Sequence, residues 1–206
     1  MKKLISIVIL SALCVAPAAA APSTLTLKAS PTVVVYGGST TLSGVLSTQK
    51  SGQRVDIQGQ DCGQTAFKKV ASVTTTAGGA FTYAAKPTMK TSYQAKQKNV
   101  TSPTVSVDTT PVLVLKKLAK NKFSVSVTAA QTFVGKFTVF QRLRKSKWVS
   151  LKHVTLTTLT QGTKPTETTS ANFTIKLPTK LKVRAVLPAA QAAVCYLPTK
   201  SKVIRS

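Results

Sequence analysis

Short runs in which apolar and polar residues alternate recur along most of the chain after residue 22. They are clear in Thr41 to Leu46, in Phe123 to Val127 and in Phe173 to Leu177. A period of two places the apolar side chains on one face of an extended segment, as in a half-buried β-strand. Thr and Val, which suit a pleated surface, are abundant throughout these runs. The pattern therefore predicts a chain built from short strands.

Turn signals separate the runs at intervals of about 8 to 12 residues, as in chains of short strands. They include Gly37-Gly38, Ser51-Gly52, Gly78-Gly79 and Gln161-Gly162. For the Ala-rich stretch from Leu187 to Val194, a loop is favoured over a helical turn because of Pro188 and its position in the repeat. About seven short strands in roughly 90 residues are typical of a β-sandwich.

The first twenty residues have a different pattern and are predicted to be a signal peptide. Lys2 and Lys3 precede an apolar run from Leu4 to Val15, and small residues around Ala18 and Ala20 follow it. A charged start, a short apolar core and an Ala-x-Ala end are typical of export signals. We expect cleavage after Ala20 or Ala21, with Ala20 favoured, bacterial origin, and a secreted or cell-envelope location for residues 22–206.

The remaining chain reads as two copies of one pattern, predicted to be domains at 22–108 and 109–206. The run from Phe67 to Thr74 corresponds to Trp148 to Thr155, with aliphatic residues and Val-Thr at matching positions. A repeat of about 90 residues is the size of a domain. A short, turn-prone connection is expected around residues 108–111. Because Trp148 aligns with Phe67, we expect its side chain in a core.

Three motifs carry a resemblance to a known family. They are Tyr36 to Gly44 (Tyr-Gly-Gly-Ser-Thr-Thr-Leu-Ser-Gly), Gly78 to Phe81, and Pro87 leading to Thr91–Ala95. With them the chain resembles tandem bacterial immunoglobulin-like or fibronectin type III-like domains. The resemblance implies an all-β chain with two tandem immunoglobulin-like β-sandwich domains after a signal peptide. It implies little about function, because such sandwiches serve as spacers, adhesins and binding modules alike.

Two cysteines remain after removal of the export signal, one in each predicted domain. Cys62 lies in a turn-like segment and Cys195 lies near the end of the second copy. An even number of cysteines in an oxidising compartment suggests a disulfide. A disulfide clamp between the domains is the favoured interpretation, and two separate thiols are the alternative. Such a clamp would stabilise the protein by roughly 2 to 4 kcal/mol.

Little material for catalysis is present. The chain has four acidic residues and one histidine, His153, which lies on a predicted strand beside Lys152. The acidic residues are too scattered for general acid–base chemistry or a calcium loop. We therefore predict no catalytic residue, no metal site, no cofactor and no enzymatic activity.

The strongest functional signal is charge. The whole chain has a net charge of +25 at pH 7. Residues 22–108 contain nine Lys and Arg against three Asp and Glu, whereas residues 109–206 contain eighteen against one. A multivalent basic surface attracts polyanions through counterion release. The candidate polyanion-binding residues are Arg142, Arg144, Lys145, Lys147, Lys180, Lys182 and Arg184. Further basic clusters contain Lys116, Lys117, Lys120, Lys122 and Lys176.

Three function hypotheses follow. The first is a non-enzymatic secreted or cell-envelope protein with a structural, adhesion or partner-docking role, its partner another envelope protein. The second is a polyanion-binding module whose second domain binds anionic cell-surface polymers, acidic glycan or extracellular DNA. The alternative reading of the same charge is that it only keeps the protein soluble. The third is a pilus-type periplasmic chaperone, which also pairs two sandwiches and uses an exposed edge strand.

Overall fold

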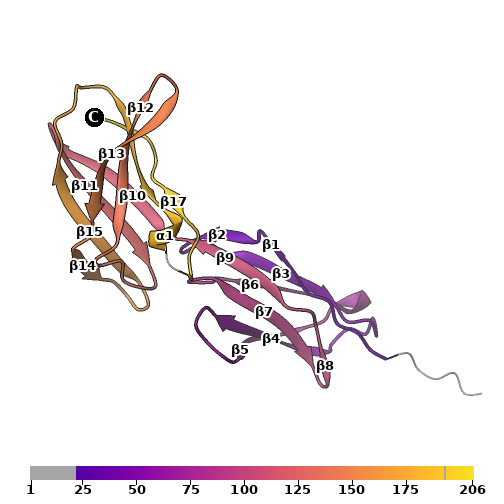
Figure 1. Cartoon of the computed structure of the whole chain (residues 1–206). Coiled ribbons are helices and arrows are strands. Elements are labelled where there is room, and N and C mark those ends of the chain that lie inside the picture. The colour runs from indigo at the N-terminus through magenta and orange to yellow at the C-terminus, as the bar shows by residue number, and fades with distance from the viewer. Residues whose placement is uncertain (1–21, 193) are drawn as a thin grey trace, which may run out of the picture.

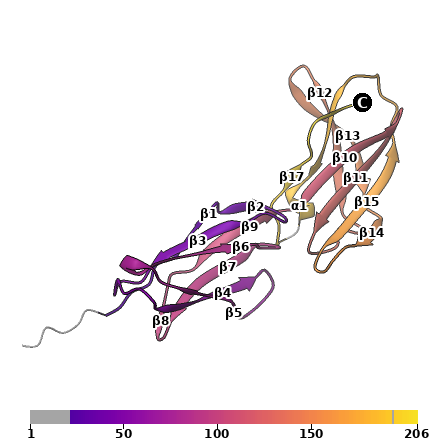
Figure 2. The same ribbon diagram turned by 180° about the vertical axis from the view of Figure 1, so that it is seen from behind.

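A computed structural model describes residues 22–192 and 194–206. The predicted signal peptide and its cleavage site lie outside the described residues. The described chain forms two β-sandwiches placed end to end at an angle, with strands running along each body (Figure 1). Seen from behind, the same two bodies meet only at their ends (Figure 2).

Domain 1, residues 28–110, packs a three-stranded sheet against a six-stranded sheet. The first sheet has the order β1-β3-β6, with bounds Lys28–Ser30, Thr40–Val45 and Ala80–Ala85. The second has the order β2-β9-β7-β4-β5, with β8 beside β7. Its strands are Val33–Val35 (β2), Val105–Thr110 (β9), Thr91–Gln97 (β7), Arg54–Asp61 (β4), Lys68–Thr74 (β5) and Val100–Thr101 (β8). β2 and β9 are parallel, and the other pairs are antiparallel.

Domain 2, residues 112–205, packs a four-stranded sheet against a five-stranded sheet. The four-stranded sheet consists of Val112–Ala119 (β10), Lys122–Ala129 (β11), Glu167–Thr174 (β15) and Thr158–Gln161 (β14), in that order. The other sheet consists of Lys147–Thr155 (β13), Phe137–Arg144 (β12), Lys182–Leu187 (β16) and Thr199–Lys200 (β17), with Ile204–Arg205 (β18) also beside β16. The predicted fold class, an all-β chain with two tandem immunoglobulin-like sandwiches, is confirmed.

The alternation of residues explains why each pair of sheets closes. Every second side chain of β4 and of β11 is buried. In domain 2 the rings of Phe123, Phe140 and Phe173 lie 5.1 to 5.7 Å apart and fill the space between the sheets. Domain 1 has its own core around Leu42, Ile57 and other aliphatic side chains. Burial of these side chains is the main favourable contribution to folding.

The two domains share details of register. The pairing of β4 with β5 shifts between Ile57 and Gln58, and that of β12 with β13 shifts between Phe140 and Gln141. Gln58 and Gln141 are therefore equivalent positions. Lys69 and Ser150, the partners of these two glutamines, are then equivalent as well, and counting back two residues aligns Phe67 with Trp148, as the sequence comparison predicts.

A serine repeats the same contacts in both domains. Ser102 accepts a hydrogen bond from the Ala95 N–H through Oγ and donates its own N–H to the Ala95 carbonyl, at 2.9 Å each. Ser201 makes the same two contacts with Ala185, also at 2.9 Å. The two domains thus keep the same hydrogen-bonding scheme between a serine and an alanine backbone.

Two local expectations are wrong. The connection around 108–111 is not a turn, because β9 continues to Thr110 and β10 starts at Val112, which leaves only Pro111 between the domains. Proline cannot donate a backbone hydrogen bond and so interrupts the pairing there. The Ala-rich stretch contains a one-turn helix, Ala189–Ala192 (α1), because Pro188 begins the helix: its carbonyl accepts from Gln191 and Ala192. A proline is tolerated at a helix start.

The junction between the domains is held by the β16–β17 connection of domain 2. Cys195 forms a disulfide with Cys62, with a Cα–Cα distance of 5.5 Å. The Lys90 N–H donates to the Cys195 carbonyl at 2.9 Å. The Tyr196 hydroxyl donates to the Thr88 carbonyl at 2.8 Å and accepts from the Ala130 N–H at 3.0 Å. Tyr196 is buried, which raises the pKa of its hydroxyl to about 12 and keeps it neutral.

No helix among the described residues has the length and apolar character needed to cross a membrane.

Candidate functional site

The hairpin formed by β12 and β13 projects from the far end of domain 2 (Figure 1). Its last pair is Arg144 opposite Lys147, and Lys145 and Ser146 form the turn. Both turn residues have positive φ, 45° and 65°, as in the two-residue turns that match the twist of a hairpin. Arg144, Lys145 and Lys147 are exposed. The hairpin therefore presents three cations at its tip.

The other candidate cations lie beside this hairpin. β16 pairs with β12, so that Val183 lies opposite Arg142, and Lys182 lies opposite Arg205 of β18. Lys180 occupies the turn before β16, where its N–H donates to the Ser206 carbonyl at 3.2 Å. The structure thus brings together two groups that are nearly 40 residues apart in the sequence.

The four-stranded sheet adds further cations at the same end. The β10–β11 turn lies next to the segment after β15, because the Leu177 N–H donates to Oδ1 of Asn121 at 3.0 Å. We call this surface the distal basic end. It consists of Lys120, Lys122, Arg142, Arg144, Lys145, Lys147, Lys176, Lys180, Lys182 and Arg205.

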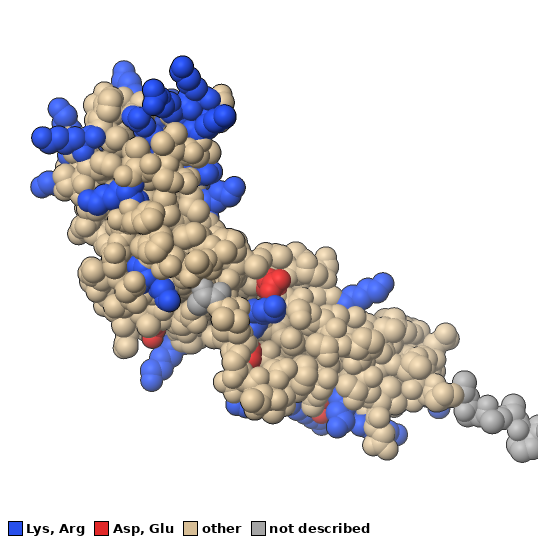
Figure 3. All heavy atoms as spheres, in the orientation of Figure 1, with Lys and Arg blue, Asp and Glu red and all other residues tan. Residues whose placement is uncertain are grey.

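Nothing acidic balances this surface among the described side chains. Glu167, the one acidic residue of domain 2, is the first residue of β15 and pairs with Gln161. It therefore lies at the end of β15 that is farther from the distal basic end. The ion pairs found in the described part of the chain all involve Asp56 or Asp108 of domain 1. Figure 3 shows blue side chains gathered at the free end of domain 2 and the red ones nearer the junction and on domain 1. The positive potential is therefore polarised along the molecule.

Arg184 differs from the other candidates. Its Nε donates to Oε1 of Gln141 at 2.9 Å, and its guanidinium lies 4.0 Å from the centre of the Trp148 ring. Partial burial lowers the pKa of Arg184 from its ordinary value, although a guanidinium stays protonated at neutral pH. These contacts engage the Arg184 guanidinium with Gln141 and Trp148 on the outer face of the sheet, beside the distal basic end.

The expected core position of Trp148 is wrong. The indole is half-buried and lies outside the core cluster of domain 2. It stands opposite Leu143 and contacts Arg184, which points away from the core because its neighbours in β16 are buried. Arg184 covers one face of the ring, and a cation over an indole is favourable by about 0.5 to 1 kcal/mol at an exposed site.

Arg142 is the most enclosed of the distal cations. It is half-buried, and its Nε is buried without a hydrogen-bond partner in the described structure. A guanidinium can leave Nε without a partner while its terminal nitrogens reach an acceptor. Arg142 is therefore less exposed to a ligand than the lysines at the hairpin tip.

Arg205 is the site residue that sequence reasoning missed. Lys200 and Lys202 precede it in the sequence, and the pairing of β18 with β16 places it beside Lys182. His153 stacks on Phe137 with ring centres 4.5 Å apart, which is a packing role. No group of three His, Cys, Asp or Glu side chains in the described residues is arranged to hold a metal ion.

Comparisons with known proteins add little. No family model matches the sequence, and no curated protein matches it. A solved marsupial T cell receptor is similar over 90% of this chain and 100% of that chain, at 12% identity and a TM-score of 0.34. A bovine butyrophilin is similar over 90% of this chain and 98% of that chain, at 10% identity and a TM-score of 0.34. The fold assignment rests on the strand pairings.

Proposed function

We propose that this protein is an exported, non-enzymatic docking protein that binds acidic polymers through the distal basic end of domain 2. One observation carries the proposal: cations from both sheets gather at one end, and the acidic residue of the domain lies at the other. Mutual repulsion of so many like charges opposes folding, so their retention favours a use for them.

The chemistry of the partner follows from the surface. Ten cations on turns and strand ends, most of them exposed, suit a chain of repeated anions better than one small anion. Teichoic acids, acidic glycans and extracellular DNA share this chemistry and occur around bacterial cells. The N-terminal pattern and the disulfide support a secreted or cell-envelope location, where structural disulfides persist.

Domain 1 then acts as a spacer or as a second docking unit. The disulfide and the Tyr196 hydrogen bonds tie the two bodies at a junction opposite the distal basic end. A bound polymer would therefore lie about one domain length from domain 1. This arrangement supports an adhesion or partner-docking role.

The test is salt-dependent binding to a defined polyanion. The mature chain and the variant Arg144→Ser, Lys145→Ser, Lys147→Ser are titrated with double-stranded DNA and with polyglycerol phosphate at several salt concentrations. We expect the slope of log K against log salt to fall by about 1 for each cation that contacts a phosphate. These side chains are exposed, so the variant keeps its fold.

A matched control removes the same charge from domain 1. The variant Lys50→Ser, Lys96→Ser, Lys98→Ser loses three exposed lysines at the other end of the molecule. It should bind nearly as the parent does. Equal losses in both variants would mean that net charge alone attracts the polymer, and the proposal would be wrong.

A further inference from the structure

The two domains differ along one side of the sandwich. In domain 2, β14 pairs with the outer edge of β15. Domain 1 has no strand in the corresponding place: β6 ends its sheet, and the described chain passes from β5 to β6 through a single turn at Ala77–Gly79. The outer edge of β6, six residues long, is therefore open to a further strand.

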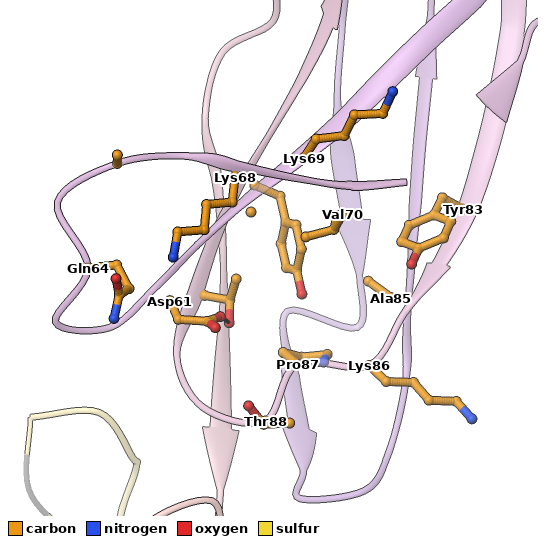
Figure 4. Close-up of a pocket in the computed structure, with 14 residues that line it drawn as sticks. Asp61, Gln64, Lys68, Lys69, Val70, Tyr83, Ala85, Lys86, Pro87 and Thr88 are labelled. Atoms are coloured by element: carbon orange, nitrogen blue, oxygen red, sulfur yellow. Dashed lines mark hydrogen bonds between the residues drawn. The ribbon is translucent and has the colours of Figure 1, made fainter. Parts of the chain in front are cut away.

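A pocket of about 500 Å³ lies between this open edge and β5 (Figure 4). Tyr83 and Ala85 of β6 line one side, Val70 of β5 lines the other, and Tyr93 and Pro87 complete the apolar lining. Val70 is 48% exposed, an unusual state for a valine that faces into a sandwich. The pocket thus offers apolar surface that nothing in the described chain covers.

A glycine keeps part of this space open. A Cβ atom at Gly59 would lie 3.2 Å from Cγ1 of Val70 and 3.3 Å from Cε1 of Tyr93. The register places Gly59 in the position of Arg142 in domain 2. The same site in the repeat is therefore empty in domain 1 and occupied by a long side chain in domain 2.

The rim of the pocket is positively charged. Lys68, Lys69 and Lys86 line it, together with Asp61. Nζ of Lys69 lies 3.0 Å from Oδ1 of Asp56, so this lysine is already paired. Lys68 and Lys86 have no carboxylate within 4.0 Å among the described residues. Charge complementarity favours an acidic occupant.

From these observations we infer that β6 and this pocket bind an extended acidic segment of a partner protein. The segment adds a strand beside β6, as β14 does beside β15, and its backbone pairs with the open edge. One apolar side chain enters the pocket, and carboxylates two positions away on either side reach Lys68 and Lys86. The site is separate from the distal basic end and does not depend on the proposed function.

The probe is a synthetic peptide, acetyl-Thr-Glu-Thr-Leu-Thr-Glu-Thr-amide, added to the isotope-labelled mature chain at physiological salt. We expect amide shift changes at β6 and at Val70 and Tyr83. Amide exchange should slow at the β6 residues whose N–H groups point away from β3, because these gain a backbone partner. A peptide with Pro in place of the central Leu cannot extend the sheet and should not protect them.

Variants separate this site from general attraction. Lys68→Glu with Lys86→Glu should raise the Kd roughly tenfold, since two exposed charge pairs become repulsive. Lys96→Glu with Lys98→Glu is the matched control and should leave the Kd within about twofold. The variant Arg144→Ser, Lys145→Ser, Lys147→Ser should bind the peptide as the parent does, so the two proposals can fail independently.

Three results would overturn the inference. The first is peptide binding without protection of any β6 amide. The second is equal binding of the proline peptide. The third is an acidic oligosaccharide, such as a hexuronic acid oligomer, that produces the same shifts with equal or higher affinity, because the pocket would then be a glycan site.

Discussion

The junction end of domain 1 and the distal end of domain 2 are equivalent ends of the repeat. In domain 1 the β4–β5 connection contains Cys62, which is bonded to domain 2. In domain 2 the equivalent β12–β13 hairpin is free and presents Arg144, Lys145 and Lys147. The strands keep their register while the tips differ completely. One end of a single scaffold thus serves as a covalent joint in one copy and as a charged surface in the other.

The equivalent positions within the sheets show the same divergence. Asp56 of domain 1 accepts from the Ser72 hydroxyl and pairs with Lys69 and Arg54, whereas the equivalent residue of domain 2 is Val139. The cations that pair with Asp56 are absent too, because the positions equivalent to Lys69 and Arg54 hold Ser150 and Phe137. The whole ion-pair cluster of domain 1 is therefore missing from the equivalent place in domain 2.

Removal of the disulfide is expected to have the largest effect on this comparison. In Cys62→Ser, Cys195→Ser the joint becomes an ordinary contact, and the free energy of unfolding should fall by about 2 to 4 kcal/mol. Denaturant unfolding followed by the fluorescence of Trp148 measures the change in the free energy of unfolding. Small-angle scattering measures whether the angle between the domains becomes more variable. Unchanged unfolding and scattering, or free thiols in non-reducing peptide maps of the parent, would contradict the clamp.

Substitution of Arg184 should have a smaller effect on stability and tests one specific contact. Its counterpart in domain 1 is Gln94, whose side-chain amide donates to Oε1 of Gln58 at 2.7 Å. Arg184→Gln should therefore keep the hydrogen bond to Gln141 and lose only the contact with Trp148. We expect a loss of about 0.5 to 1 kcal/mol and altered Trp148 emission.

The variant Arg184→Gln also tests whether Arg184 takes part in polyanion binding by the distal basic end. Polyanion binding by Arg184→Gln should stay closer to that of the parent than binding by Lys145→Ser, although each variant loses one charge. A larger loss in Arg184→Gln would place Arg184 in the binding surface instead.

The smallest effect concerns the carboxylate that domain 2 lacks. The hydrogen bond from Ser72, with those from Lys69 and Arg54, lowers the pKa of Asp56 from 3.8 to about 2. Because this pKa is lower in the folded protein, ionised Asp56 stabilises domain 1 above about pH 4, and this contribution is lost as the pH falls through about 2. In Ser72→Ala the pKa should rise toward 3.8, as measured by carboxyl NMR titration. An unchanged pKa would assign the shift to the lysine and arginine.

Much of the fold could be predicted from the sequence, because its main features are periodic. The alternation in Phe123 to Val127 predicts a strand with one buried face, and the strand is found. The alignment of Phe67 with Trp148 agrees with the strand register. Such features depend on local spacing, which a sequence shows directly.

Other features depend on contacts between distant segments. The half-buried state of Trp148 follows from its place at the end of the hairpin and from Arg184 on another strand. Arg205 joins the distal basic end only because β18 pairs with β16. The pocket beside β6 is open because domain 1 has no described strand equivalent to β14. No sequence motif marks the absence of a strand, so this feature could not be predicted.

The bond between Cys62 and Cys195 has one more consequence, for proteolysis. It closes a covalent ring that contains the hairpin tip, since residues 144–147 lie between the two cysteines. Arg144 and Lys145 are natural cleavage points for trypsin-like proteases, and exposed turns are the usual sites of nicking. A single cut there would leave both fragments in one molecule, and only reduction would release them.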